Sequence, residues 1–206
     1  MSDMNVYQEL KRQILLLEQK PGAVIREKEV MEAFKVSRTP VREALMRLEM
    51  DGLVRIFPNV GTFVEDVSFQ QLKDVFEIQA HLVRLAGSLA AVRITTEEVA
   101  EIRNKIKMMK PAQDTKVLMQ LDGEIHTIIN RATRNEMLVK MLDALHDQAV
   151  RIWTFAGAEG GYWRSLEQEF EDIAAALEQH DEALTARLLE VHSNRFVEHV
   201  RSQLTF

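Results

Sequence analysis

Helix-breaking residues are unevenly distributed along this chain, and their distribution limits the possible folds more than any other feature. Of the 206 residues only 8 are Gly and 4 are Pro, and Pro21, Pro40 and Pro58 fall within the first 58 residues. Both residue types end helices and mark turns. Short elements are therefore expected near the start of the chain, and long helices in the rest.

The first part of the sequence predicts three helices and a β-hairpin. Apolar residues recur at helical spacing in three segments, and two β-prone segments flank a short PNVG loop. Thr39 is placed to cap the third helix, with Pro40 at its first position. The predicted elements are helices at 4–19, 26–34 and 39–52 and strands at 53–57 and 62–65. This order is typical of a winged helix-turn-helix.

From Ser68 onward the apolar periodicity is helical and no strand signal appears. A helix start is indicated at Thr95 or Thr96, because glutamates follow closely. The predicted helices are 69–92, 96–109, 114–131, 134–155, 163–179 and 181–203. We therefore expect a mainly α chain with two domains, a winged helix-turn-helix at 1–67 and an antiparallel all-α bundle of about six helices at 68–206.

Composition indicates a globular chain in the cytoplasm. The chain has 46% hydrophobic and 28% charged residues, and it has no Cys, which excludes disulfides and thiolate metal sites. No signal segment and no apolar run of membrane-spanning length is recognised, so no membrane partner is expected. Residues 1–67 hold 10 Lys+Arg against 11 Asp+Glu, and the remainder holds 16 against 21. The net charge therefore neither favours nor excludes nucleic-acid binding. What matters is whether the Lys and Arg residues are gathered on one face.

The third predicted helix divides into an apolar and a polar face. Its apolar stripe is Val41, Ala44, Leu45 and Leu48. Donors gather at its beginning: Ser37, Arg38, Thr39 and Arg42. A helix N-terminus suits a phosphate, and arginine reads guanine through two hydrogen bonds. Lys28 and Arg47 are better suited to backbone phosphates. The arrangement predicts binding of double-stranded DNA.

Two runs make this part similar to a known family. "KPGAVIREKEVMEAFKVSRTPVREALMRLEMDGLV" and the following "PNVGTFV" resemble the DNA-binding domain of the GntR family of bacterial transcription regulators. The resemblance implies operator contacts by Lys28, Ser37, Arg38, Thr39 and Arg42. It also implies that the wing around Asn59 and Gly61 reaches the minor groove. Val60 stands where relatives often carry Arg, which weakens the expectation of a wing cation.

The segment "LDGEIH" places Asp122 four residues ahead of His126. Residues four apart share one face of a helix, so this pair could bind a metal, act as an acid and a base, or simply belong to a solvated helix surface. The spacing alone does not choose among the three.

The second part of the chain resembles the ligand-binding domain of the FadR subfamily (the FCD type, in its shorter VanR-like branch). This resemblance implies a cavity for a divalent metal (Zn, Mn or Ni) and a small carboxylate effector. Asp122, His126 and His192 match three of the family's metal ligands, whereas Phe170 stands where a further His belongs. Asn135 matches the family's Asn-containing turn and is a candidate effector contact.

Other residues of the second part give evidence both for and against an effector site. Gln79 and Val83 replace an Arg and a Glu that relatives often carry. Arg151, within an apolar neighbourhood, is a candidate contact for an effector anion. The remaining histidines lack a partner at recognisable spacing and are interpreted as surface or partly buried helix residues: His81, His146, His180 and His199.

These observations favour a homodimeric transcription regulator that binds a near-palindromic operator and responds to a small effector. One alternative keeps the DNA-binding domain but makes the bundle a dimerisation unit with a decayed effector site, which Phe170, Gln79 and Val83 support. A second alternative is a metal-dependent hydrolase. No further general base is recognised and the first domain would be unexplained, so we do not expect an enzyme.

Overall fold

The computed structural model describes residues 3–110, 112, 114–157, 163 and 165–203. Their contacts divide the chain into two units. The first is Met1–Leu72 with Asp147–Phe155, and the second is Lys73–His146 with Ala156–Phe206. The domain boundary between residues 67 and 68 stays a prediction.

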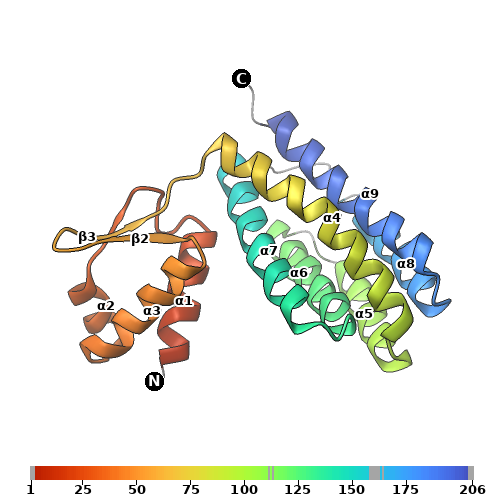
Figure 1. The fold of residues 1–206 in the computed structure, drawn as a ribbon, viewed down its shortest axis with the longest axis horizontal. Helices are drawn as coiled ribbons and strands as arrows, with labels where there is room; N and C mark the ends of the chain where they lie inside the picture. Colours follow the sequence, from red (N-terminus) through yellow and green to blue (C-terminus); the bar gives the residue numbers. More distant parts are fainter. Residues whose placement is uncertain (1–2, 111, 113, 158–162, 164, 204–206) are drawn as a thin grey trace. The chain divides into compact units, whose positions relative to one another are not determined.

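Three helices and a small antiparallel sheet form most of the first unit (Figure 1). Its elements are α1 (Asp3–Leu15), β1 (Val24–Ile25), α2 (Glu27–Phe34), α3 (Arg38–Met50), β2 (Val54–Phe57) and β3 (Gly61–Val64). The strand order is β1-β3-β2, with Val54 opposite Val64 and Val24 opposite Phe63. The predicted winged helix-turn-helix is confirmed. Strand β1 was not predicted, because two residues are too short to show a period.

Two predicted helix ends in this unit are wrong. Helix α1 ends at Leu15 instead of Gln19, because the backbone turns at Leu17, whose φ is 56°. Helix α3 begins at Arg38, and its N-cap is Ser37, which has the extended backbone (φ −75°, ψ 177°) that an N-cap residue requires. Thr39 therefore lies inside the first turn and does not cap the helix.

The core of the first unit is apolar and closely packed. The predicted stripe of α3 is confirmed, since Val41, Ala44, Leu45 and Leu48 are each at most 1% exposed. They join residues from α1 and the sheet in one cluster that includes Leu10, Ile14, Leu53 and Val64. Burying an apolar side chain of this size contributes about 1.5–3 kcal/mol to stability. The cluster therefore holds α3 in one orientation within the first unit.

The described part of the second unit is helical, as predicted. The helices are α4 (Phe69–Arg93), α5 (Thr96–Met109), α6 (Thr115–Ala132), α7 (Glu136–Ala156), α8 (Leu166–Glu178) and α9 (Glu182–Gln203), and the last residues of α7 belong to the first unit. The start of α5 has a complete capping box: Thr95 accepts from the Glu98 backbone N–H, and the Glu98 carboxylate accepts from Thr95 N–H.

Helices α4 and α9 lie side by side in the second unit (Figure 1). A Cβ added to Gly87 would lie 2.8 Å from the Ala186 Cα, so the two backbones approach more closely than any larger residue allows. Arg84 forms an ion pair with Glu190 across the same pair of helices. This contact joins the beginning and the end of the helical unit.

Among the described residues, one helix is long and apolar enough to cross a membrane by length and composition alone. It is the 21-residue part Lys73–Arg93 of α4. The expectation that no such run exists is therefore wrong. The finding is weak, because core helices pass the same test, and Val83, Ala86 and Ala90 of this segment are buried.

Candidate functional site

Two groups of predicted site residues can be located in the structure, one in each unit. The first group surrounds the beginning of α3, where Ser37, Arg38 and Thr39 are exposed. Burial of the apolar stripe turns the opposite face of α3 toward solvent. The side chain of Arg42, one turn further along, is 57% exposed and lies on that face.

A single carboxylate, that of Glu27 at the start of α2, binds both arginines of this face. Glu27 Oε2 accepts from Arg38 Nε at 2.6 Å, and Glu27 Oε1 lies 3.2 Å from Arg42 Nε. Arg38 is the main cause that holds the pKa of the Glu27 carboxyl below its usual value. The two guanidinium groups are therefore held together at the start of the helix while keeping most of their surface in water.

The other predicted cations of the first unit have different surroundings. The Lys28 side chain is 86% exposed, and its Nζ lies 3.9 Å from Glu32 Oε1. Arg47, by contrast, stacks on the Tyr7 ring with its Cζ 4.1 Å from the ring centroid. Arg47 is thus held against α1, whereas Lys28 is unconstrained.

The wing is the hairpin between β2 and β3. Asn59 adopts a left-handed φ of 62°, and Val60 N–H donates to Phe57 O at 3.1 Å to close the turn. Val60 is 72% exposed at the tip, so the residue that replaces a cation there presents an apolar side chain to solvent.

The second group brings together residues from the sixth and ninth helices. Asp122 and His126 lie one turn apart on α6, and His192 is on α9. Their ligand atoms all lie within 4.8 Å of one another. His126 Nε2 is 3.1 Å from His192 Nε2, and Asp122 Oδ1 is 3.6 Å from His192 Nε2. We call Asp122, His126 and His192 the donor trio.

Burial governs the protonation of two members of the donor trio. It is the main cause that lowers the pKa of His126 to about 3, with His192 as a second cause. Burial also raises the pKa of the Asp122 carboxyl, partly offset by His192 and then His146. Within the described residues, Asp122 Oδ1 is buried without a hydrogen-bond partner. His126 is therefore neutral near pH 7, which is the form that binds metals.

His192 has a partner on its second ring nitrogen. Its Nδ1 donates to Glu169 Oε2 at 3.0 Å, and the other oxygen of Glu169 lies 2.7 Å from Arg195 Nη1. A proton on Nδ1 leaves the lone pair on Nε2, the atom that faces the rest of the donor trio. Sequence reasoning missed Glu169, because a glutamate before Phe170 on α8 is a common surface residue type.

Phe170 lies against the donor trio. Its ring centroid is 4.9 Å from that of His192 and 5.8 Å from that of His126, and the side chain is fully buried. The position expected for another ligand thus holds an apolar ring that excludes water from one side of the trio.

A further histidine, His146 of α7, lies beside the trio. Its ring centroid is 6.0 Å from that of His126. Gly123, which follows Asp122, makes room for this ring, since a Cβ there would lie 2.9 Å from His146 Nε2. His146 is a partly buried helix residue, as expected, and it also contacts the trio through His126. A glycine in mid-helix next to Asp122 was the available signal.

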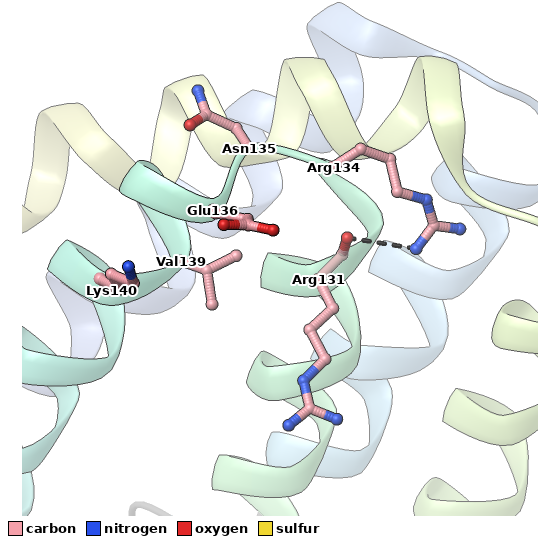
Figure 2. A pocket seen from close by; sticks show the side chains of 6 residues that line it. All are labelled: Arg131, Arg134, Asn135, Glu136, Val139 and Lys140. Atoms are coloured by element: carbon pink, nitrogen blue, oxygen red, sulfur yellow. Dashed lines mark hydrogen bonds between the residues drawn. The ribbon is translucent and has the colours of Figure 1, made fainter.

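The two candidate effector contacts, Asn135 and Arg151, each have hydrogen bonds within their own unit. Asn135 Oδ1 accepts from Leu138 N–H at 3.2 Å at the start of α7. Figure 2 shows that Asn135 lines a cavity of about 450 Å³ at the α6–α7 turn, together with Arg131, Arg134, Glu136, Val139 and Lys140. Arg151 belongs to the first unit, is fully buried, and donates to the backbone oxygen of Glu65.

Comparison with known proteins identifies both parts of the chain. Residues 3–64 match the family model described as bacterial regulatory proteins, gntR family, and residues 74–195 match the FCD domain. The Nta operon transcriptional regulator of Aminobacter aminovorans is 32% identical over 131 residues, which cover 63% of this chain and 62% of that relative. The HTH-type transcriptional repressor RspR of Escherichia coli (strain K12) is 26% identical, covering 97% of this chain and 89% of RspR.

A solved structure agrees in fold. E. coli McbR/YncC superposes with a TM-score of 0.85 at 23% identity, over 98% of both chains. The matched families are those of transcriptional regulators and not of enzymes. The chain belongs to the GntR family of bacterial regulatory proteins and is a transcriptional regulator with a DNA-binding winged helix-turn-helix and an FCD effector-binding domain.

Proposed function

We propose that this regulator binds a near-palindromic operator as a homodimer in the cytoplasm, and that a divalent metal and a small carboxylate effector in the FCD domain modulate its DNA affinity. The convergence of the donor trio carries this proposal, because its ligand atoms lie within 4.8 Å of one another and the buried Asp122 Oδ1 has no hydrogen-bond partner among the described residues. Unpartnered buried polar atoms are costly and mark sites that a ligand completes.

The donor set fits a metal such as Zn²⁺, Mn²⁺ or Ni²⁺. Two imidazole nitrogens and one carboxylate oxygen suit these ions, and catalytic-type zinc sites have three protein ligands with an open position. Ligands of a tetrahedral zinc lie about 3.3 Å apart for a Zn–N distance of about 2.0–2.1 Å. The His126–His192 separation of 3.1 Å and the Asp122–His192 separation of 3.6 Å are close to that value.

Within this proposal the chain's residues have distinct tasks. Asp122, His126 and His192 hold the metal, which when bound offers a positive centre for an effector carboxylate. Glu169 keeps His192 in the tautomer whose Nε2 is available. Asn135 remains a candidate effector contact through the cavity of Figure 2, and Arg151 remains one through its Nε and Nη1, which have no partner among the described residues.

The DNA contacts follow from the exposed face of α3. We assign base recognition to Arg38 and Arg42, and phosphate contacts to the remaining polar groups, namely Lys28, Ser37, Thr39, Arg47, and the wing backbone at Asn59 and Gly61. A two-fold symmetric dimer places two such faces in successive major grooves.

A second candidate is a regulator whose FCD domain serves dimerisation alone. The buried ring of Phe170 favours it, because this ring fills the position of a further ligand and packs on both histidines of the trio. Gln79 and the buried Val83 point the same way, since neither offers a charge to an effector carboxylate.

Two measurements separate these candidates. Protein purified without chelator should contain stoichiometric metal that is lost in His192→Ala, whereas the dimerisation-only candidate predicts none in either. Operator DNA selected from the source genome should then bind with an affinity that metal and effector change about 5- to 150-fold, the range for a coupling of roughly 1–3 kcal/mol. Equal operator affinity at fixed salt, with and without every ligand that stabilises the protein, would contradict regulation by ligand.

A further inference from the structure

His146 lies beside the donor trio and belongs to α7, a helix from which the family resemblance predicts no metal ligand. It lies on α7, within the second unit, and its ring is tilted by 44° to that of His126 at a centroid distance of 6.0 Å. The His126 and His192 rings are 5.1 Å apart and tilted by 41°. His126 thus has an imidazole on either side, one from α9 and one from α7.

The backbone of α6 is shaped to admit this side chain. The Nε2 end of the His146 ring points at Gly123, where a Cβ would be 2.9 Å away. Glycine in mid-helix is less favourable than alanine by about 0.5–1 kcal/mol, so a close approach is a physical reason for it here. The approach brings His146 Nε2 next to the residue that follows Asp122.

The donor trio itself leaves a place for one more ligand. Phe170 contacts the trio from α8 but offers no lone pair. Zinc in closed sites takes four protein ligands, and nitrogen is a preferred donor. His180 is engaged elsewhere, with its Nδ1 2.6 Å from Ala91 O, and His81 is exposed on α4.

We propose that His146 is the fourth protein ligand of the metal, bound through Nε2, so that α7 supplies the imidazole that Phe170 cannot. The inference rests on the proposed metal site. The group of ligand atoms within 4.8 Å of one another consists of the trio and does not include His146. Metal binding by His146 therefore requires its side chain to rotate toward the trio. Occupancy of the site thereby ties α7 to α6 and α9.

The test uses the full chain stripped of metal and titrated calorimetrically with Zn²⁺ alone. His146→Gln should weaken Zn²⁺ binding at least about tenfold, the lower end of the loss seen when even an outer partner of a ligand is removed. His81→Gln is the matched control and should bind like the wild type. With Co²⁺ alone, the visible absorption bands should shift in His146→Gln and stay unchanged in His81→Gln.

A second variant displaces His146 without removing it. Gly123→Ala places a methyl group 2.9 Å from His146 Nε2, so the ring must move away. Its Zn²⁺ affinity should fall in the same direction as that of His146→Gln, while circular dichroism shows an intact helical fold. A structural role for Gly123 alone would leave Zn²⁺ binding unchanged.

The two possible failures are distinguishable. If the wild type and His126→Ala alike bind no Zn²⁺, the proposed metal site is refuted, and this inference with it. If His126→Ala loses Zn²⁺ but His146→Gln and Gly123→Ala bind like the wild type, the metal site stands and the assignment of His146 is overturned.

Discussion

The start of α3 and the donor trio both bring polar side chains close together, yet they do so in opposite environments. Arg38 and Arg42 are 63% and 57% exposed and share the Glu27 carboxylate. The members of the donor trio are at most 17% exposed, and one buried oxygen has no hydrogen-bond partner among the described residues. At the start of α3, water and the Glu27 carboxylate stabilise the charges, whereas in the donor trio, within the described part of the chain, only His192 has a carboxylate partner outside the trio, Glu169.

This difference teaches how each place should respond to its ligand. Ion pairs between exposed groups contribute about 0–1 kcal/mol, so DNA can replace Glu27 easily, and salt will weaken DNA binding. Buried groups without partners carry a desolvation cost of about 1–3 kcal/mol each, which a bound ion removes.

The largest expected effect tests the exposed place directly. Arg42→Ala and Arg38→Ala should each weaken operator binding by about 1–3 kcal/mol, roughly 5- to 150-fold, because each removes a group assigned to a base edge. Fluorescence anisotropy at fixed salt measures the loss. Arg103→Ala is the matched control, since Arg103 also binds two carboxylates, those of Glu171 and Glu178, but in the helical unit. Equal losses in all three variants would argue against the assigned face.

The next largest effect is expected when a metal ligand is added beside the donor trio. Phe170→His should raise Zn²⁺ affinity at least about tenfold, since an imidazole replaces a ring that contacts both histidines. The metal-free variant should be less stable, because a buried polar ring costs about 1–3 kcal/mol without a partner. Phe170→Leu, the control, should lose stability without gaining affinity. Unchanged Zn²⁺ binding in Phe170→His would show that the position does not face the metal.

A third substitution should change stability without changing DNA binding or Zn²⁺ binding. Thr95→Ala removes the capping box of α5 and should lower the free energy of unfolding by about 1 kcal/mol. Urea unfolding measures it, with Thr96→Ala as a control that stays within about 0.5 kcal/mol of the wild type. A change in DNA or Zn²⁺ affinity in Thr95→Ala would mean that the two places are coupled through this helix.

The smallest effect concerns Glu27. Glu27→Gln removes the charge that Arg38 and Arg42 share, and the change in stability should be below about 1 kcal/mol because all three side chains are partly in water. Operator affinity should rise slightly, since DNA no longer competes with a carboxylate. Glu32→Gln, which removes the 3.9 Å pair with Lys28, should leave it unchanged. A fall in operator affinity would show that Glu27 positions the arginines for DNA.

Local patterns could be predicted well because the physics behind them is local. The stripe of α3 and the six long helices follow from apolar spacing, and their ends agree within a few residues. The Ser37 cap and the two-residue β1 were missed, because a cap depends on the backbone angles of one residue and so short a strand depends on its partner, β3.

The donor trio could be predicted only in part. Asp122 and His126 share a helix face, but His192 is 66 residues away from His126 and was assigned through the family resemblance. Glu169 and His146 could not be assigned, because their closeness to the trio depends on how α7, α8 and α9 pack against α6. A single glycine, Gly123, was the visible trace of that packing.

The close approach of α4 and α9 has a mechanical consequence. Gly87 packs directly against the Ala186 backbone, so a shift of one helix along the other would cause a steric clash at this point. The two helices are therefore expected to move together. His192 lies less than two turns beyond Ala186 on α9, and α4 begins at Phe69, directly after the wing strand ends at Val64. A displacement of α9 at His192 would therefore also displace α4, the helix that it packs against.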